Sequence, residues 1–382
     1  MPLSDVGSAP VQVKEPIDSP VIKPLRLPHV RSLDGLRGLA SIAVLMHHCL
    51  FTDVPIFVFP VATRLVEAFS SYLYLGVDLF FTLSGYLITS LLLLDRRDPD
   101  YYRNFYWKRF FRIIPALVLV LLLTHALGWT PWIGVLLALL FVANFMNFWG
   151  KPEIGPFWSL AIEEQFYLVW PMVVRKERPR KMVRVLLAVM IVPAVLRVIS
   201  WLLHHGRQHY TFVHCDGLAW GALLAVMCFS ARIPWRSYNN LRLWRKVGAW
   251  MFWAGALGML GEVFLVLNSR IDYGLSLTAA APLFTGVLAY LITHPKAGIS
   301  RFLASRPLRF LGDVSYMVYL SHTYFLEFYD AHSRGWWAHP TTGGLYLRFF
   351  VVLAITLLWS ALSLYLYERP IGRLRRTFIT RP

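Results

Sequence analysis

The chain has 382 residues, of which 57% are hydrophobic and only 15% are charged, so its composition lies outside the range of soluble globular domains. Its formal net charge of +17 would suit a nucleic-acid-binding protein, but the basic residues lie between long apolar runs. This distribution predicts an all-α, polytopic membrane helix bundle that has membrane lipids, and no nucleic acid, as partners.

The N-terminal residues 1–30 contain six prolines and no apolar core, which predicts a disordered cytoplasmic tail rather than a signal peptide. Beyond this tail we searched for apolar segments of about 20 residues, the length that crosses a hydrocarbon core about 30 Å thick. Eleven segments qualify: 33–52, 72–94, 110–128, 132–149, 158–174, 183–203, 213–230, 247–267, 274–293, 310–330 and 346–367.

The basic residues near the ends of these segments predict their orientation, because Lys and Arg mark the cytoplasmic side. Alternate loops carry 30 of the 38 basic residues: 1–31, 95–112, 175–184, 231–246, 294–310 and 369–381. The remaining loops carry one each: Arg64, Arg207, Arg270 and Arg334. This asymmetry predicts that both termini lie in the cytoplasm. The protein as a whole is expected in the cell (cytoplasmic or inner) membrane.

Three apolar segments lie between the basic loops 95–112 and 175–184, yet only an even number of segments can cross the membrane there. The segment 132–149 is the one that we expect not to cross. Its sequence is bounded by Gly, Pro and Trp and contains Asn144 and Asn147, which suits a re-entrant or interfacial segment. We therefore predict about ten transmembrane helices in a membrane domain of residues 31–372, followed by a basic cytoplasmic tail of residues 373–382.

The first apolar segment, "RSLDGLRGLASIAVLMHH", contains Arg37 near the cytoplasm and His48 in the outer half. A helix turns about 100° per residue, so these two side chains lie within about 20° of each other and roughly 16 Å apart along the axis. His47 points about 100° away from this face. Arg37 could simply extend to the headgroups and His48 could have a structural role, and we expect Asp34, one turn earlier, to orient Arg37.

The next motifs combine small and charged residues at helix positions. In "GVDLFFTLSGYLI", Ser84 could donate a hydrogen bond to an oxyanion, although helix packing is a sufficient reason for it. In "FYWKRFFRIIP", Arg109 and Arg112 are three residues apart and share a helix face. They either anchor the helix on the cytoplasmic side or bind phosphates through paired guanidinium groups.

The segment "PFWSLAIEEQFYLVWP" places Glu163 and Glu164 side by side among aromatic and aliphatic residues. At least one of these acids should face protein rather than lipid. It could act as an acid or base or orient a histidine, and the alternative is an ion pair with an arginine inside the membrane.

Two further groups of polar residues follow. The first lies at an expected outer membrane edge and comprises His204, His205, His209, His214 and Asp216. Its spacings match no standard metal site, so we predict no metal and assign Asp216 to substrate binding. In "LGDVSYMVYLSHTYFL", Ser315, Tyr319 and His322 lie on one helix face, and Tyr319 and His322 are candidates for an acceptor pocket.

Taken in order, these motifs resemble the integral-membrane acyltransferase 3 family, which includes O-antigen and peptidoglycan O-acetylases and macrolide O-acyltransferases. "LDGLRGLASIAVLMHH" is similar to the opening signature, in which an Arg or Lys precedes an essential His by ten intervening residues, here Arg37 and His48. The other matching blocks are "GVDLFFTLSGYLI", "KRFFRIIP", "FWSLAIEEQFYLVWP", "SYMVYLSH" and "YERP", so the resemblance covers most of residues 31–372.

The resemblance implies ten spans, a cytoplasmic acyl-CoA donor and an acceptor hydroxyl, often of a saccharide or glycosylated molecule, at the outer face. We expect an acetyl group, transferred directly by a stand-alone form without a C-terminal hydrolase-like domain. In this hypothesis Arg109 and Arg112 bind the phosphates of acyl-CoA and Arg37 lines the channel mouth.

The chemistry is assigned to His48, as a general base on the acceptor hydroxyl or as a nucleophile that forms an acyl-imidazole, with the base preferred. Glu163 or Glu164 would orient or charge-balance His48. The competing hypothesis is a transporter of acyl groups or glycolipids, but the sequence shows neither inverted repeats nor paired broken helices.

Overall fold

The computed structural model describes residues 30–50, 72–149, 155–203, 210–229, 241–268, 274–333 and 342–379. Within these ranges the regular structure is helical, which confirms the all-α membrane bundle. The predicted tail over residues 1–29 and the histidines His204, His205 and His209 lie outside the described residues.

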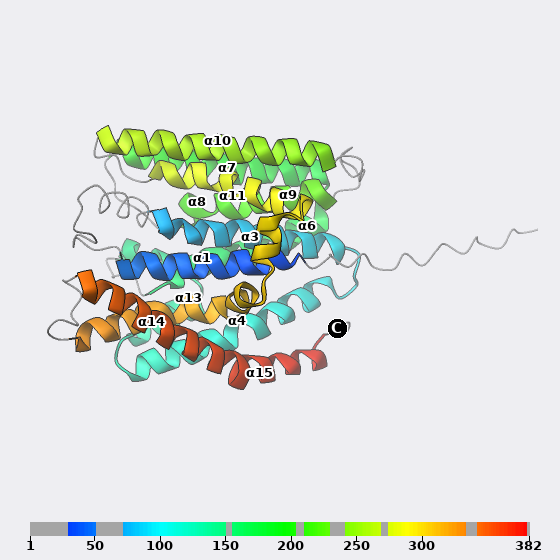
Figure 1. Cartoon of the computed structure of the whole chain (residues 1–382). Coiled ribbons are helices and arrows are strands. Elements are labelled where there is room, and N and C mark those ends of the chain that lie inside the picture. Colours follow the sequence, from blue (N-terminus) through cyan, green and yellow to red (C-terminus); the bar gives the residue numbers. More distant parts are fainter. Residues whose placement is uncertain are drawn as a thin grey trace, which may run out of the picture.

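Ten helices of the described part have 14 or more residues and run side by side in Figure 1. They are α1 (Arg31–Leu50), α3 (Gly76–Leu94), α4 (Tyr101–Ala126), α6 (Phe157–Lys176), α7 (Pro179–Leu202), α9 (Asp216–Phe229), α10 (Leu241–Asn268), α11 (Gly274–Thr293), α13 (Arg306–His332) and α14 (Thr342–Ser363).

Shorter elements connect or extend these helices. They are η1 (Leu73–Leu75), α5 (Trp132–Leu139), η2 (Ala143–Trp149), α8 (Thr211–His214), α12 (Gly298–Leu303), the π-helical turn η5 (Leu364–Glu368), α15 (Arg369–Leu374) and η6 (Arg375–Thr377). The start of α1 and the C-terminal α15 lie at the same end of the bundle (Figure 1).

Five described helical stretches are long and apolar enough to cross a membrane by composition alone: 73–94, 101–126, 179–200, 276–293 and 343–374. The sequences of α1, α6 and α13 are interrupted by charged and polar residues, and several of these residues lie in the candidate site. The total of ten spans, and the cytoplasmic side of both termini, stay predictions from the basic residues.

The segment 132–149 does not form a continuous helix, in line with the expectation that it does not cross the membrane. Its helix α5 has eight residues and is about 12 Å long, too short to cross the membrane. The chain then turns at Phe141, whose φ of 54° is unusual for a residue with a side chain. Gln165 on α6 donates hydrogen bonds to the Phe141 carbonyl (2.7 Å) and to Asn144 (3.0 Å), so polar partners satisfy this irregular backbone.

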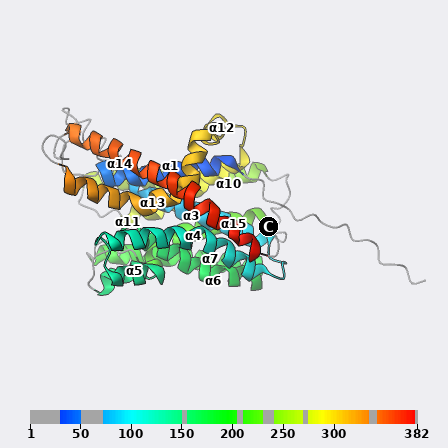
Figure 2. The same cartoon turned by 90° about the horizontal axis from the view of Figure 1, so that it is seen from below.

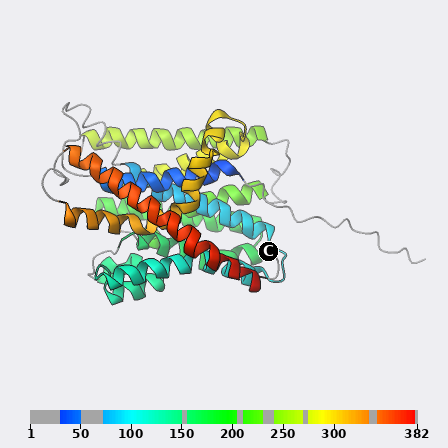
Figure 3. The same cartoon turned by 60° about the horizontal axis from the view of Figure 1, so that its bottom comes forward.

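Two neighbouring hydrophobic clusters form the centre of the bundle, and α3 contributes to both. One joins α3 to α4, α6, α7 and α9, and the other joins α3 to α1, α9 and α11. Figure 2 shows α3 between α1 on one side and α4 and α6 on the other. In Figure 3, α14 crosses the outside of this arrangement obliquely towards α15. The centre of the bundle is therefore bordered by helices that are distant in sequence.

The helices α3 and α9 cross at backbone contact because each presents a glycine to the other. A Cβ atom on Gly85 would lie 2.0 Å from the Leu218 carbonyl oxygen, and one on Gly221 would lie 1.9 Å from that of Thr82. Small residues at such positions let membrane helices approach closely. This crossing fixes α3, which carries Ser84 into the site.

We expect Gly221→Ala to reduce thermal stability in detergent strongly, by about 3 kcal/mol or more, because the added methyl group meets backbone rather than a movable side chain. Gly261→Ala is the matched control, since a Cβ atom there would have no neighbour within 4 Å. A melting temperature of Gly221→Ala equal to that of the control would contradict the close crossing.

Candidate active site

A cavity of about 110 Å³, the inner cavity, lies among α1, α3, α4, α6 and α13. Its walls include apolar side chains from α3, but its polar lining is unusual for the interior of a membrane bundle. Seven residues singled out from the sequence line it: Arg37, Ser84, Arg109, Arg112, Glu163, Ser315 and Tyr319. Motifs from five helices therefore meet at one place.

A larger cavity of about 360 Å³ lies beside it, where α3 and α4 face the C-terminal elements η5, α15 and η6. This outer cavity, the mouth, shares Ile88, Arg109 and Arg112 with the inner cavity. Its charged lining is mostly basic: Lys108, Arg109, Arg112, Arg369 and Arg375 against Asp95 and Glu368. The element α15, which lines the mouth, lies at the end of the bundle where α1 begins (Figure 1), the end predicted to be cytoplasmic.

Arg37 is hydrogen-bonded to α13. Its Nε donates to the Ser315 hydroxyl oxygen (3.0 Å) and its Nη2 to the Gly312 carbonyl (3.3 Å), while Ser315 itself donates to Gly312 (2.8 Å). Asp34, expected to orient Arg37, interacts with it electrostatically. The sequence did not identify the hydrogen-bonding partners on α13, which fix the guanidinium at the wall of the inner cavity.

Arg109 forms an ion pair with Glu164, and both side chains are nearly buried, with exposed fractions of 13% and 14%. The guanidinium carbon also lies 3.5 Å from the centre of the Tyr167 ring, a cation–π contact. Glu164 therefore adopts the alternative that the sequence left open, the intramembrane ion pair. The expectation that Glu164 orients His48 is wrong, because its carboxylate neutralises Arg109.

Glu163 faces the inner cavity, unlike its neighbour. It accepts a hydrogen bond from the Tyr167 hydroxyl (3.2 Å) and has Ser84 as a second hydrogen-bonding neighbour. The two adjacent acids thus have different surroundings: Glu164 balances a buried arginine, and Glu163 presents a carboxyl group to the cavity. Arg112, in contrast to Arg109, is an exposed side chain that lines both cavities.

His48 lies beside His322, which is a contact between α1 and α13. The His48 Nδ1 is 2.8 Å from the Val44 carbonyl oxygen, and the His322 Nδ1 is 2.8 Å from that of Tyr319. Carbonyl oxygens only accept hydrogen bonds, so each neutral ring carries its proton on Nδ1. The His322 Nε2 then accepts from the His48 Nδ1 at 3.4 Å. Among the described residues, no hydrogen-bond partner of the His48 Nε2 is found, so this nitrogen keeps a lone pair for a proton.

The environments of the two histidines differ. His48 is an exposed residue at the outer end of α1, whereas His322 is 1% exposed and deeply buried. The side chain that contacts the His48 ring is therefore a second histidine, and a charge-balancing role of Glu163 stays a prediction. A ring whose Nδ1 is fixed by a partner and whose Nε2 is accessible is suited to accept a proton from a bound hydroxyl.

Tyr319 connects the inner cavity with the histidine pair. Its hydroxyl donates to the Ser159 hydroxyl oxygen (2.5 Å), which in turn donates to the Pro156 carbonyl (3.1 Å). Its ring centre is 5.9 Å from that of His322. The predicted acceptor-pocket residues Tyr319 and His322 therefore lie next to each other, one on the cavity wall and one against His48.

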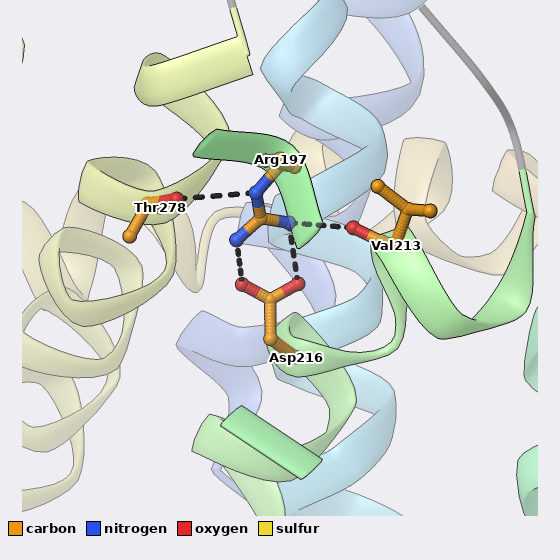
Figure 4. A network of polar contacts seen from close by, with 4 residues as sticks. All are labelled: Arg197, Val213, Asp216 and Thr278. Atoms are coloured by element: carbon orange, nitrogen blue, oxygen red, sulfur yellow. Dashed lines mark hydrogen bonds and ion pairs between the residues drawn. The ribbon is translucent and has the colours of Figure 1, made fainter. Parts of the chain in front are cut away.

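Asp216 has a structural partner, which corrects the assignment of this residue to substrate binding. Its two carboxylate oxygens accept hydrogen bonds from Arg197 Nη1 (3.0 Å) and Nη2 (2.5 Å), as Figure 4 shows. Arg197 also donates to the Val213 carbonyl (2.7 Å) and to Thr278 (3.1 Å). The two charged side chains are only 3% and 4% exposed, so both oxygens of Asp216 are already used.

Sequence reasoning did not single out Arg197, although a signal was present. It is a lone cation in the apolar run "MIVPAVLRVISWLL", and such a residue needs a carboxylate partner inside the membrane. Of the proposed outer-edge cluster, His214 is buried against the ring of Trp158, with 5.5 Å between ring centres.

Comparison with known proteins agrees with these motifs. Residues 30–365 match a family model described as an acyltransferase domain. The chain is 28% identical over 331 residues to the peptidoglycan O-acetyltransferase OatA of Listeria monocytogenes, which is 77% of this chain and 49% of that protein. It is 25% identical over 381 residues to the O-acetyltransferase OatA of Staphylococcus aureus, which is 90% of this chain and 57% of that protein.

A third relative, YrhL of Bacillus subtilis, is 30% identical over 336 residues, which is 77% of this chain and 48% of that protein. The chain thus spans about half the length of the curated relatives that it matches. No solved structure matches the chain.

Proposed function

We propose, from the premise that the chain belongs to the membrane acyltransferase 3 family, that it transfers an acyl group from acyl-CoA to a hydroxyl of a saccharide or glycosylated acceptor. One observation carries the proposal: the basic mouth and the inner cavity share Arg109 and Arg112, and Tyr319 connects the inner cavity with the pair His48–His322.

The mouth suits the nucleotide end of acyl-CoA, which carries several negative charges on its phosphates. Lys108, Arg112, Arg369 and Arg375 offer cations from two different parts of the chain. Charge-assisted hydrogen bonds from arginine to phosphate are among the stronger polar contacts in proteins. Arg109 is neutralised by Glu164, so in this proposal its role is to shape the passage between the two cavities, and Arg112 is the main ligand of the phosphates.

The acyl end of the donor would extend through the inner cavity towards His48. Arg37 marks the level of this cavity, and His48 lies eleven residues later on α1, roughly 16 Å along the helix axis. An extended pantetheine arm has a length of the same order. The thioester carbonyl would then reach the histidine pair while the phosphates stay in the mouth.

The chemistry we propose is direct transfer. The Nε2 of His48 accepts the proton of the acceptor hydroxyl, whose oxygen attacks the thioester carbonyl carbon. The C–S bond breaks, the sulfur takes a proton and leaves as the thiol of CoA, and an ester remains on the acceptor. The charge that His48 acquires is stabilised because its Nδ1–H donates to His322.

The acceptor is proposed from the three relatives, all of which bear the name O-acetyltransferase, with peptidoglycan in the names of the Listeria protein and of YrhL. We therefore propose an acetyl group as the acyl group and a cell-wall saccharide as the first acceptor to test. The protein would act in the cytoplasmic membrane.

The test is transfer by the purified protein in detergent, with radiolabelled acetyl-CoA and a soluble peptidoglycan fragment. An enzyme forms labelled saccharide without a membrane or an ion gradient. A transporter forms no such product under these conditions. The absence of labelled saccharide at every donor concentration would reject the proposal.

Replacing Arg112 with alanine is expected to raise the KM for acetyl-CoA about tenfold and to change kcat little, because a phosphate contact made in the ground state is lost. Arg103→Ala is the control, since Arg103 is an exposed arginine of the same helix that does not line the mouth. Competition by desulfo-CoA measures the affinity directly. Equal KM values for the two variants would contradict donor binding at Arg112.

A further inference from the structure

The outer end of α1 has a hydrogen-bond donor that comes from a distant part of the chain. The last carbonyl groups of a helix have no partner within that helix. One of them, the Cys49 carbonyl, accepts a hydrogen bond from Nη1 of Arg348 on α14 at 2.9 Å. The Arg348 side chain is only 8% exposed, so this contact is made inside the bundle.

The same guanidinium binds a carboxylate on a third helix. Nε of Arg348 donates to Oδ1 of Asp330 (2.9 Å) and Nη2 donates to Oδ2 (2.6 Å). Asp330 belongs to α13, so one arginine links α1, α13 and α14 through three directional contacts. The planar fork of arginine makes these contacts from three separate nitrogens, whereas lysine would have to donate from a single nitrogen.

The linked positions are next to the histidine pair. Cys49 follows His48 directly on α1. Asp330 lies eight residues after His322 on α13, which is about 12 Å along that helix. The helices joined by Arg348 are therefore the helices whose relative position sets the 3.4 Å contact between His48 and His322.

The side chains packed around this region are apolar, and they hold the helices only weakly against a shift along the helix axis. Leu45, Cys49, Val318 and Val352 belong to one hydrophobic cluster between α1, α13 and α14. A small shift of one helix along its axis weakens a hydrogen bond more than it reduces the burial of aliphatic side chains, because burial is not directional. Arg348 thus adds directional contacts at the outer end of α1, whereas the hydrogen bonds of Arg37 to Ser315 and Gly312 join α1 to α13 near its other end.

We propose that Arg348 and Asp330 are positioning residues that fix α1 against α13 so that the Nδ1 of His48 stays on the Nε2 of His322. This inference rests on the proposed role of His48 as general base. Neither residue needs to contact donor or acceptor. They affect the reaction through the hydrogen bond that Arg348 donates to the Cys49 carbonyl, next to His48.

The test is Arg348→Lys, which keeps the charge and loses the fork. We expect kcat to fall by about 10²-fold, because a displacement of about 1 Å at a reacting group has an effect of this size. The KM for acetyl-CoA should stay unchanged, because the mouth is at the other end of the bundle. Asp330→Asn is a second variant with the same expectation, should the lysine variant fail to fold.

Arg197→Lys is the control, since Arg197 and Asp216 form another bidentate pair that links other helices and is more deeply buried, with exposed side-chain fractions of 3% and 4% against 8% and 29% for Arg348 and Asp330. We expect it to lower the melting temperature to a similar extent and to leave kcat per folded molecule at the wild-type value. A wild-type kcat in both Arg348→Lys and Asp330→Asn, or an equal loss in Arg197→Lys, would overturn the inference. If the wild-type protein itself transfers nothing, it is the proposed function that fails.

Discussion

The variant His48→Ala is expected to lose acyl transfer by about 10²- to 10⁴-fold, the range that a general base contributes. The accessible Nε2 of His48 is the group that removes the proton from the acceptor hydroxyl in our proposal. Because His48 is an exposed residue, removal of its ring leaves the packing of α1 and α13 almost unchanged. The measurement is the initial rate of product formation by purified variant, normalised to monodisperse protein.

His47→Ala is the matched control for this prediction. His47 is the neighbouring imidazole, but it points about 100° away on the helix and its ring lies 5.8 Å from that of Tyr74 instead. We expect it to retain most of the activity. Comparable rates for His48→Ala and the wild type would reject His48 as the base.

Arg109→Met is the second variant with a large expected effect, a loss of about 3–5 kcal/mol of stability. The substitution leaves the Glu164 carboxylate nearly buried and without the cation that it contacts. It also removes the cation–π contact with Tyr167. We expect little monodisperse protein after extraction, measured by size exclusion and by thermal unfolding in detergent.

The double variant Arg109→Met with Glu164→Met separates stability from function. Replacing both members of a buried ion pair by apolar residues of similar size is often close to neutral. We therefore expect the double variant to regain most of the lost stability. If it stays as unstable as Arg109→Met alone, the ion pair does not explain the effect of that substitution.

Local patterns in the sequence predicted the helices and much of the site. The eleven-residue spacing of Arg37 and His48 puts both on one face of one helix, which needs only helix geometry. The Gly, Pro and Asn content of 132–149 predicted that this segment does not cross, and α5 is eight residues long. The cavity then brings together Arg37, Arg109 and Glu163, which the motifs had singled out separately.

Partners across the bundle could not be predicted, because they depend on how helices pack rather than on local spacing. His48 and His322 are 274 residues apart, and Arg348 and Cys49 are 299 apart. The sequence showed only that Asp216 is a polar residue at a membrane edge. The packing of α7 on α9 is needed to see that both of its carboxylate oxygens accept hydrogen bonds from Arg197. The choice between Glu163 and Glu164 likewise followed from the position of Arg109.

The most direct test of the central claim uses sealed vesicles that contain the reconstituted protein, with radiolabelled acetyl-CoA outside and a saccharide acceptor either inside or outside. Acetyl-CoA does not cross the bilayer, so only molecules with their basic mouth outward can react. We expect labelled product when the acceptor is inside the vesicles and none when donor and acceptor are on the same side. Equal product from the same side would contradict a donor that enters at the mouth and reacts at His48 in the opposite half of the membrane.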